Sequence, residues 1–588
     1  MTKSQYSEKL KSCFISENFE ELKSDPTKND LRKFRKLLNK FLTNIDENYH
    51  KKFEPNQRIK QGYGLIKLHK DGFPIRPIIS SFQTITSNSE AMFLQFLKPL
   101  EKSIKFSVDS SKTFKLQIQP ILEKNDLTEY TFVSFDARDL YTKCNLEKIK
   151  KIICSKMFDK KGKQSLFPES ENSKMSKSSF IEFFDAILTE FNNFQCPLGY
   201  FKQIKGLSMG SKLSGFLSNI FLNDLETKIL PKYLKKRTIL HYGRYVDDCL
   251  LLVKKNEFHK IFDEFNNYDD KLNFTFEEMS ENKINFLDMT IELKFNKCLI
   301  WNYVKPQNLL KTTDFKFDVS PKQQKVGTLV GEIYRINNTS NTPETLAHGL
   351  EKLKQKYLKN NFPEKLVSEK IHEVQNRNFE KSEYRREINE KIKNTSFDDS
   401  HSLTLPFTSF RCQNVATEIR KIISRFCPEF SVNICFSTIK LKNILNPKLK
   451  SKIDLKNTCC SVYQFKCKCN EIYVGETKKL LEFRVFEHRR DVQSHVKMHI
   501  DNCAIYQNNL LSSLGPEPSL AQKRCFLLNH FSILEKNLTN SYIRKTAEAN
   551  FINLLEPSLN KQVFHHKMTL ICSCLSKNPD KAIPEGIT

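Results

Sequence analysis

The sequence predicts a multidomain α+β protein, in which a long region of mixed strands and helices precedes a smaller α/β domain. At 588 residues the chain is too long for one hydrophobic core, so two or more domains are expected. Apolar residues make up 39% of the chain and include 47 Phe, which is enough to build several cores. After about residue 455 the sequence becomes rich in Cys and His, and this change marks the second domain.

Charge and hydropathy narrow the class of protein. Lys and Arg number 95 against 68 Asp and Glu, a surplus of 27, and the pI is about 9.3. Such a surplus indicates a polyanionic partner, because Lys and Arg displace the counterions condensed on phosphate backbones. A basic solvated surface is the alternative. No apolar run approaches the roughly 20 residues that cross a bilayer, and the N-terminus lacks a signal peptide's apolar segment. We therefore expect an intracellular protein with no membrane partner and mostly reduced thiols.

Apolar periodicity and capping signals predict the elements in chain order. The strongest helix signal begins at Thr342, a cap that is followed by Pro343 and by Leu at 346, 350 and 353. A polar loop is expected over 159–179. The other expected elements are a helix over 29–45, a hairpin over 62–80, a strand from 131, helices over 178–191 and 213–230, and a hairpin over 241–253.

Three aspartates stand at the ends of apolar strands. Asp136 ends the run "FVSFD", while Asp247 and Asp248 interrupt the apolar stretch "HYGRYVDDCLLLV". If these strands are neighbours, the carboxylates converge, and buried carboxylates are costly without a cation beside them. Two hard divalent cations held by carboxylates are what in-line phosphoryl transfer uses. The pattern therefore predicts a magnesium site, and the alternative is a solvated turn with a chance Asp-Asp pair.

Five segments in this order resemble the successive palm motifs of reverse transcriptases, and more narrowly those of Penelope-like retroelements. They are "YGLIKLHKDGFPIRPIIS", "FVSFDARDLYT", "QIKGLSMGSKLSGFLSNIF", "RYVDDCLLLV" and "LNFTFEEMSENKINFLDMTI". The resemblance covers nearly the whole chain. It implies a right-hand polymerase, with an antiparallel palm sheet, partial fingers and a helical thumb that includes the helix from Thr342.

The resemblance assigns roles to residues of these motifs. Asp136, Asp247 and Asp248 would hold two Mg²⁺ ions, with Asp248 the more peripheral of the turn pair. The residues that would bind the incoming nucleotide are Arg76 for the triphosphate, Tyr141 against the ribose 2′-OH, and Met209, Gly210 and Ser211 as a platform. The alternatives are that Tyr141 packs as core, that Arg76 pairs with a surface carboxylate and that the glycines only turn the chain.

The Cys/His-rich end resembles GIY-YIG nucleases. The tyrosine motifs "SVY" and "YVG" lie ten residues apart, and a helix then carries Arg484 and His488 on one face. The departures are Ser461-Val462 for the first Gly-Ile and Val474 for the second Ile. The implied catalytic residues are Tyr463 or His488 as proton acceptor, Tyr473 as orienter, Arg484 as transition-state stabiliser and Glu548 as the sole Mg²⁺ ligand, with Asn560 bracing the site. A surface Arg/His pair is the alternative.

A zinc site is also predicted in this part of the chain. Cys467 and Cys469 lie between the two tyrosine motifs, and His499 and Cys503 follow at a spacing that is typical of structural zinc sites. The resemblance suggests a Cys-Cys-His-His cluster, whose fourth ligand is either His495 or Cys503. The alternative is a set of buried reduced cysteines with a solvated histidine.

Together these resemblances imply an RNA-directed DNA polymerase fused to a GIY-YIG endonuclease, which works in the nucleus by target-primed reverse transcription. Its partners would be an RNA template, a DNA primer or target DNA, and dNTPs; the oligomeric state stays open. An upstream fingers motif is absent, so the chain is expected to be truncated at its N-terminus. An idle nucleic-acid-binding relic and a nuclease-only remnant are the rival hypotheses.

The expected domains are 1–60 (helical, partial fingers), 61–310 (fingers and palm), 311–400 (thumb), 401–455 (connector), 456–565 (nuclease) and 566–588 (tail).

Overall fold

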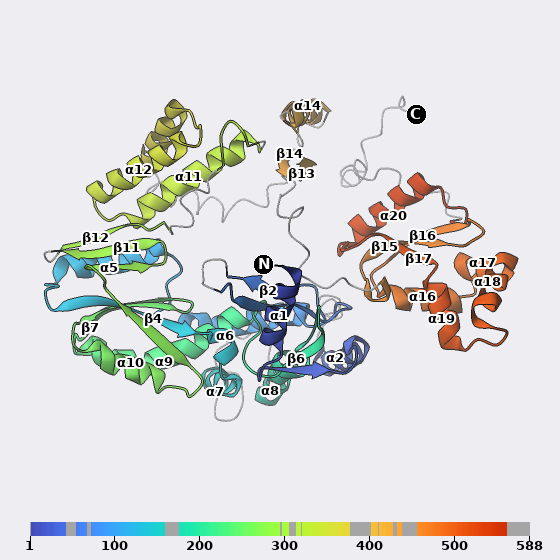
Figure 1. Cartoon of the computed structure of the whole chain (residues 1–588), viewed down its shortest axis with the longest axis horizontal. Coiled ribbons are helices and arrows are strands. Elements are labelled where there is room, and N and C mark those ends of the chain that lie inside the picture. Colours follow the sequence, from blue (N-terminus) through green and yellow to red (C-terminus); the bar gives the residue numbers. More distant parts are fainter. Residues whose placement is uncertain are drawn as a thin grey trace.

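The computed structural model describes most of the chain as mixed α/β structure (Figure 1). The predicted tail over 566–588 and most of the predicted loop over 159–179 lie outside the described residues. The described ranges are 2–42, 55–67, 72–158, 176–294, 297–304, 313–318, 320–376, 401–407, 409, 411–426, 428, 432–437 and 455–560. Within these ranges, no helix combines the length and the apolar character that spanning a bilayer requires.

Four antiparallel strands form the central sheet, in the order β7-β8-β4-β9. Alternate residues of β8 enter two different cores: Leu250 and Leu252 pack with α5, whereas Cys249, Leu251 and Val253 pack with α9 and α10. Because both faces are covered, β8 is apolar throughout rather than alternating. The elements are β4 (Tyr130–Arg138), β7 (Ile239–Tyr245), β8 (Asp248–Lys254), β9 (Asn273–Glu278), α5 (Ser111–Lys124), α9 (Ser214–Lys235) and α10 (Phe258–Asn266).

A five-stranded sheet, in the order β1-β6-β5-β2-β3, lies beside the central sheet. The predicted hairpin over 62–80 is confirmed as β2 and β3, with Leu65 opposite Arg76. Leu10 and Phe14 of α1 pack on this sheet against Phe194. The elements are α1 (Lys3–Phe14), β1 (Phe19–Leu22), β2 (Lys60–Ile66), β3 (Ile75–Ser80), β5 (Asn193–Cys196) and β6 (Gly199–Gln203).

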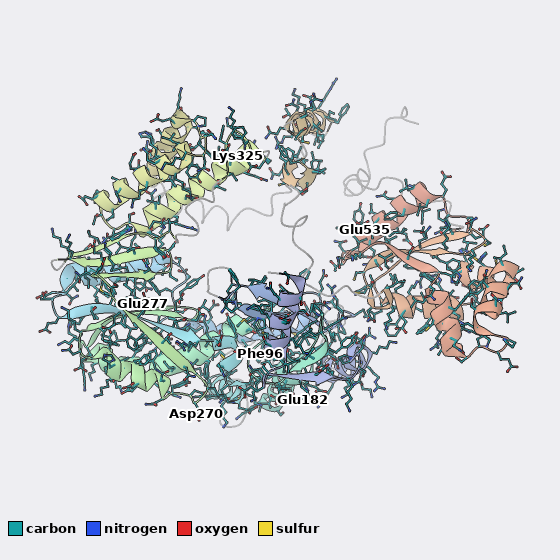
Figure 2. All side chains as sticks on the ribbon, in the orientation of Figure 1. Phe96, Glu182, Asp270, Glu277, Lys325 and Glu535 are labelled. Atoms are coloured by element: carbon teal, nitrogen blue, oxygen red, sulfur yellow. The ribbon has the colours of Figure 1, made fainter. Side chains whose placement is uncertain are left out.

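Helices around these two sheets follow the predicted apolar patterns, with one exception. The helix predicted over 29–45 is present as α2 in the described residues, and it buries Leu31, Phe34 and Leu38 on one face. Phe180 of α8 stacks with Phe96 of α4, which Figure 2 labels, at 6.1 Å between ring centroids. The single helix predicted over 178–191 ends at Asp185, and a π-helical turn, η3 (Ala186–Glu190), follows it. The helices are α2 (Thr27–Leu42), α4 (Ser87–Leu97), η1 (Lys98–Ser103), α6 (Leu140–Lys143), α7 (Leu146–Met157) and α8 (Lys177–Asp185).

A three-stranded sheet and two helices follow the central sheet in the chain. The helices, called here the helical pair, are α11 (Lys322–Thr339) and α12 (Pro343–Leu358), and they pack through Leu329, Ile333, Leu353 and Tyr357. The predicted cap at Thr342 is confirmed, because its hydroxyl accepts a hydrogen bond from Thr345 N. Lys325 of α11 is buried, yet its Nζ donates to the Phe315 carbonyl at 2.8 Å (Figure 2). The strands are β10 (Lys283–Phe286), β11 (Met289–Lys294) and β12 (Lys297–Asn302).

Residues 455–560, called here the C-terminal unit, form a three-stranded antiparallel sheet in the order β16-β15-β17 with surrounding helices (Figure 1). A parallel strand pair with one helix precedes it, within the predicted connector: β13 (His401–Pro406), α14 (Arg411–Phe426) and β14 (Val432–Ser437). The elements of the C-terminal unit are η5 (Leu455–Asn457), β15 (Ser461–Lys466), β16 (Ile472–Thr477), α16 (Leu481–Arg490), α17 (His495–Asn502), α18 (Ala504–Leu514), α19 (Leu520–Leu528), β17 (Phe531–Glu535) and α20 (Ser541–Leu555).

His241 on β7 makes the stability of the central sheet depend on pH. Its ring lies 5.3 Å from that of Phe114, its Nε2 is buried without a hydrogen-bond partner, and burial lowers its pKa to about 4. The unfolded chain takes up this proton near pH 6.5, so stability present above pH 6.5 is lost as the pH falls toward 4. At pH 5 the loss is about 2 kcal/mol.

We expect His241→Phe to remove this loss. The measurement is the urea midpoint at pH 7.5 and pH 5, followed by the fluorescence of Trp301, the single tryptophan, on the neighbouring β12. His372→Gln, at an exposed histidine, is the control and should keep the wild-type dependence. Equal pH dependence in the wild type and His241→Phe would contradict the prediction.

Candidate active sites

The turn between β7 and β8 brings the three predicted aspartates together along the backbone. Asp136 of β4 lies directly opposite Asp248 of β8 in the antiparallel register, and Asp247 occupies the turn. The Ala137 amide donates to the Asp247 carbonyl at 3.3 Å. Opposed residues of an antiparallel pair have Cα atoms about 4.5–5.5 Å apart, so Asp136 and Asp248 project from adjacent positions.

The carboxylates are more exposed than the apolar sequence around them suggested. Asp136 and Asp248 are exposed and Asp247 is half-buried. Their face of the sheet is uncovered at this point, whereas Ala137 and Cys249 on the other face stay buried. Among the described residues, only a Cys/His group brings three or more Cys, His, Asp or Glu donor atoms within 4.8 Å of one another. The three aspartates are therefore neighbours along the backbone, but their carboxylate oxygens do not all lie within 4.8 Å of one another. Their oxygen donors are of the kind that Mg²⁺ prefers.

Tyr141 and Arg76 face the same space as Asp247. Burial raises the pKa of Tyr141 and the nearby Asp247 carboxylate raises it further, whereas a hydrogen bond with Ser218 and the charge of Arg76 lower it. The Arg76 side chain is exposed on β3. Tyr141 also packs against the main core, so the core role and a site role are both compatible with its position.

The loop that carries Met209, Gly210 and Ser211 runs along β3. Ile79 N donates to the Met209 carbonyl at 2.8 Å, and Ser81 N donates to the Gly210 carbonyl at 3.3 Å. Gly210 has a φ of +125°, and a Cβ there would lie 2.7 Å from the Ile79 carbonyl oxygen, so a side chain is excluded. Because β3 also carries Arg76, the loop and the exposed arginine belong to one surface.

Sequence reasoning missed the buried polar network under this loop. The Glu90 carboxylate accepts hydrogen bonds from Ser211 Oγ at 2.8 Å and Lys212 N at 3.2 Å, and Lys60 Nζ lies 3.3 Å from it. Burial alone would raise the pKa of Glu90, but Lys60 and the hydrogen bonds outweigh it and the pKa is lowered. The sequence carried no signal for it, because Glu90 stands among small polar residues in "TSNSEAM".

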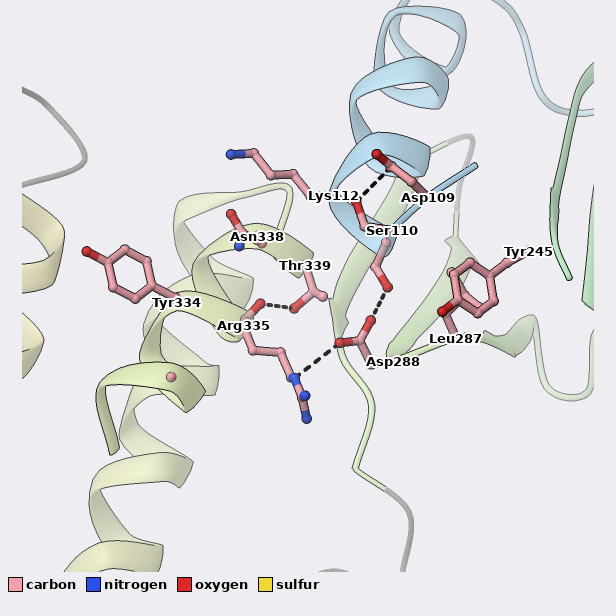
Figure 3. A pocket seen from close by; sticks show the side chains of 12 residues that line it. Asp109, Ser110, Lys112, Tyr245, Leu287, Asp288, Tyr334, Arg335, Asn338 and Thr339 are labelled. Carbon is pink, nitrogen blue, oxygen red and sulfur yellow. Dashed lines mark hydrogen bonds and ion pairs between the residues drawn. The ribbon is translucent and has the colours of Figure 1, made fainter. Parts of the chain in front are cut away.

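A cavity of about 500 Å³ lies between the central sheet and the helical pair (Figure 3). Tyr245, two residues before Asp247, lines it, together with Asp109 and Lys112 at the start of α5. On its other side, Arg335 Nε of α11 lies 3.3 Å from Oδ2 of Asp288, which is in the turn between β10 and β11 (Figure 3). The sequence analysis assigned none of these lining residues to a site.

Residues 68–295 match the sequence model of a family described as "Reverse transcriptase (RNA-dependent DNA polymerase)". These residues form a reverse transcriptase domain. The match covers the three aspartates, Arg76, Tyr141 and the loop over 209–211, and its mixed α/β architecture is consistent with a right-hand polymerase fold. The match ends before the C-terminal unit.

The other comparisons are more distant. No curated protein matches the chain. Similar solved structures include apo telomerase from Candida tropicalis truncated from its C-terminal domain, at 18% identity over 45% of this chain and 60% of that one, with a TM-score of 0.31. Telomerase from Candida albicans in complex with the TWJ fragment of telomeric RNA has 14% identity over 65% of this chain and 74% of that one, with a TM-score of 0.32. The Sicinivirus 3Dpol RNA-dependent RNA polymerase has 12% identity over 56% of this chain and 71% of that one, with a TM-score of 0.34. The alignment thus spans three fifths of the first telomerase chain.

The C-terminal unit gathers a second group of polar side chains, around Tyr463 of β15. Its hydroxyl accepts a hydrogen bond from Arg484 Nε at 3.0 Å and lies 2.7 Å from His488 Nε2. Gly475 lies opposite Tyr463 on β16, and a Cβ there would be 2.6 Å from the tyrosine hydroxyl. Because Gly475 has no side chain, the Tyr463 hydroxyl can occupy this position. His488 Nδ1 lies 2.7 Å from Ser494 Oγ, a residue that the sequence analysis missed.

The protonation of this group follows from its burial. The pKa of His488 is lowered to about 3 by burial and then by the charge of Arg484, so the imidazole is neutral at pH 7. Burial raises the pKa of Tyr463 and of Tyr473. Burial and the neighbouring Glu476 raise the pKa of Glu548 on α20 to about 7. His488 is thus buried rather than on the surface, and Glu476 is a second carboxylate that sequence reasoning missed.

Asn560 lies along the edge strand β16, and the zinc candidates Cys467 and Cys469 lie in the turn between β15 and β16. Asn560 makes two 2.8 Å hydrogen bonds to the backbone of Val474, next to Tyr473. The Cys/His group consists of Cys467, Cys469, His499 and Cys503, all donor atoms lying within 4.8 Å of one another.

The Cys/His group could hold a metal ion. The sulfurs of Cys467 and Cys503 are 3.9 Å apart, close to the roughly 3.8 Å that two Zn–S bonds of about 2.3 Å at a tetrahedral angle require. Cys469 Sγ lies 3.4 Å from His499 Nε2. Of the two candidates for the fourth position, Cys503 belongs to the group and His495 does not. The suggested Cys-Cys-His-His set is therefore replaced by three cysteines and one histidine.

We expect the full chain to carry about one zinc ion at this group, because four soft or borderline donors already lie within 4.8 Å of one another. Cys469→Ser should reduce bound zinc, measured by atomic emission after dialysis, to near zero and lower the thermal unfolding midpoint. Cys525→Ser, at an exposed cysteine of α19, is the matched control and should keep the metal. Zinc retained by Cys469→Ser would contradict the assignment.

Proposed function

We propose that the chain is an RNA-directed DNA polymerase that extends a DNA 3′ end on an RNA template. One observation carries the proposal: within the reverse transcriptase domain, Asp136 is paired across strands with Asp248 beside the turn that holds Asp247. The central sheet would be the palm, the five-stranded sheet part of the fingers and the helical pair the thumb.

The three aspartates would hold two Mg²⁺ ions, since their oxygens suit a hard cation and their exposure leaves room for it. When bound, the ions would activate the primer 3′-OH and stabilise the leaving pyrophosphate. Arg76 would bind the triphosphate, for which its planar donor fork is suited. Tyr141, between Asp247 and Arg76, would exclude the ribose 2′-OH and so select dNTPs. The loop over 209–211 would support the nucleotide and the template base.

The cavity of Figure 3, at the junction of the proposed palm and thumb, is too small to enclose a duplex and would lie against the phosphate backbone of the primer–template. Lys112 and Arg335 line it and would contact phosphates. Among the lysines of α12 and its C-cap, Lys352 and Lys359 are exposed, whereas Lys356 lies 2.8 Å from Glu332 of α11. Lys356 therefore contributes to helix pairing, and a phosphate contact is assigned only to the other two.

A second activity is proposed for the C-terminal unit, that of a GIY-YIG endonuclease. Support comes from the Tyr463–His488 contact, in which the neutral imidazole can accept a hydrogen bond from the tyrosine hydroxyl, and from Arg484 beside the same hydroxyl. Tyr463 would take the proton of the attacking water, Arg484 would stabilise the pentavalent phosphate and Tyr473 would orient the substrate. Glu548 would hold one Mg²⁺, which when bound would polarise the scissile phosphate. The Cys/His group would hold structural zinc beside β15.

The two activities together would amount to target-primed reverse transcription by a Penelope-like retroelement in the nucleus. The nuclease nicks target DNA, and the polymerase extends the resulting 3′-OH on the element's RNA. Support for this order of steps is the presence of both candidate sites on one chain. The idle relic and the nuclease-only remnant are the rival functions, and the following two experiments separate them.

For the polymerase, Asp247→Ala should lower primer extension on poly(rA)/oligo(dT) with dTTP and Mg²⁺ by about 100-fold or more, since a lost metal ligand removes several kcal/mol of transition-state stabilisation. Asp263→Ala, at an exposed aspartate of α10, is the control and should extend normally. A wild type that binds the duplex but extends nothing would favour the relic.

For the nuclease, Glu548→Gln should reduce Mg²⁺-dependent nicking of supercoiled plasmid by about 100-fold, because the amide removes the charge that holds the metal. Glu535→Gln, at an exposed residue of β17, should nick normally. Asp247→Ala should also nick normally without dNTPs. Nicking in a wild type that never extends a primer would indicate the nuclease-only remnant, and no Glu548-dependent nicking would contradict the nuclease.

A further inference from the structure

Two opposite charges are buried beneath the turn that carries Asp247 and Asp248. The side chains of Arg244 on β7 and Glu226 on α9 are both 1% exposed. Arg244 Nε donates to Glu226 Oε1 at 2.5 Å, and Nη2 donates to Oε2 at 3.2 Å. Removing two charges from water costs free energy that a hydrophobic pair of the same volume would not incur, so such a pair is weak evidence of a role in stability.

The remaining donor of the guanidinium contacts the turn itself. Arg244 Nη1 donates to the Val246 carbonyl at 3.0 Å and to Asn219 Oδ1 at 2.6 Å. Val246 has a φ of +59°, a left-handed conformation that is costly for a β-branched residue. Val246 immediately precedes Asp247, so the guanidinium holds the strained peptide from which the aspartate side chains project.

Both partners of the pair are themselves fixed. The Arg244 amide donates to the Phe106 carbonyl at 3.0 Å, and its carbonyl accepts from Val108 N at 2.8 Å. Tyr242 Oη donates to Glu226 Oε1 at 2.8 Å. Glu226 stands on the helix that follows the loop over 209–211, so the pair connects that loop's helix to the aspartate turn.

We propose that Arg244, anchored by Glu226, is a positioning residue that fixes the Asp247–Asp248 turn and thereby sets the divalent-metal affinity of the palm site. This inference rests on the proposed polymerase function. The planar fork is essential because it reaches Glu226, Asn219 and Val246 at once, which the single ammonium of a lysine does not do.

The test separates positioning from stability by two variants of the full chain. Arg244→Met with Glu226→Leu replaces the pair by apolar side chains, an exchange that often leaves stability unchanged or raised, but it removes the contact to Val246. Arg244→Lys keeps the charge and loses the fork. The control is Lys232→Gln, which breaks a largely exposed ion pair with Glu264 at the far end of the same helix.

Three quantities are measured. Mn²⁺ binding is followed by electron paramagnetic resonance, and the palm site is defined as the part of the isotherm that Asp247→Ala removes. The thermal midpoint reports folding. Primer extension gives kcat, KM for dTTP and the half-saturating Mg²⁺ concentration.

We expect both Arg244 variants to weaken palm-site Mn²⁺ binding about tenfold or more, as loss of an outer-sphere support does in metal sites. They should lower kcat, raise the half-saturating Mg²⁺ concentration and leave KM for dTTP unchanged. The double variant should keep the wild-type midpoint, and Lys232→Gln should match the wild type throughout.

Wild-type Mn²⁺ affinity in either folded variant would overturn the inference, and so would the absence of any Asp247-dependent Mn²⁺ site. If the double variant does not fold, the palm-site Mn²⁺ affinity of Arg244→Lys alone is compared with that of the wild type, and an unchanged affinity overturns the inference. An Asp247-dependent Mn²⁺ site in a wild type that extends no primer would contradict the polymerase instead, and the Mn²⁺ comparison would still judge the role of Arg244.

Discussion

The antiparallel pairing of β4 with β8 places Asp136 opposite Asp248, and the other parts of the candidate polymerase site are arranged around these two strands. The register of β8 against β4 is fixed because β8 is buried on both faces. Leu250 and Leu252 enter one core, while Cys249 and Leu251 enter the other. A slip of one residue would exchange the two sets and turn Asp136 to the opposite face. The position of the carboxylates is therefore set by the packing of apolar side chains several residues away.

Both candidate sites place reactive side chains on strands and support them with buried polar groups from a helix. In the reverse transcriptase domain, Glu226 of α9 binds Arg244, which holds the turn before Asp247. In the C-terminal unit, His488 of α16 contacts Tyr463 of β15. The difference is access to solvent: Asp136 and Asp248 are exposed, whereas Tyr463 is fully buried. An exposed carboxylate pair suits hydrated cations, and a buried tyrosine suits proton transfer through a neutral imidazole.

The contacts between the C-terminal unit and the reverse transcriptase domain with its N-terminal helices are weaker than the contacts within each of these two parts. Lys28 of α2 lies 2.8 Å from Glu482 of α16, and Asn457 Nδ2 donates to Asp25 at 3.2 Å. Lys28 is 57% exposed, and such a surface pair contributes about 0–1 kcal/mol. Phe483 adds an apolar contact with the main core of the reverse transcriptase domain. Each unit thus owes its stability to its own core rather than to this contact.

Local patterns in the sequence determined the elements that depend on near neighbours. The apolar run of β8, the cap at Thr342, the hairpin of β2 and β3 and the buried positions of α2 are all predicted by spacing alone, because burial on one face or both imposes a period along the chain. The order of five motifs also indicated the reverse transcriptase domain. Only the tertiary structure decided which distant polar groups meet. Lys60 with Glu90, Glu226 with Arg244, and Cys467 with Cys503 join residues from distant parts of the chain. It also decided that Asp136 and Asp248 are exposed, because exposure depends on how far other elements cover that face of the sheet, and periodicity along one strand carries no information about that cover.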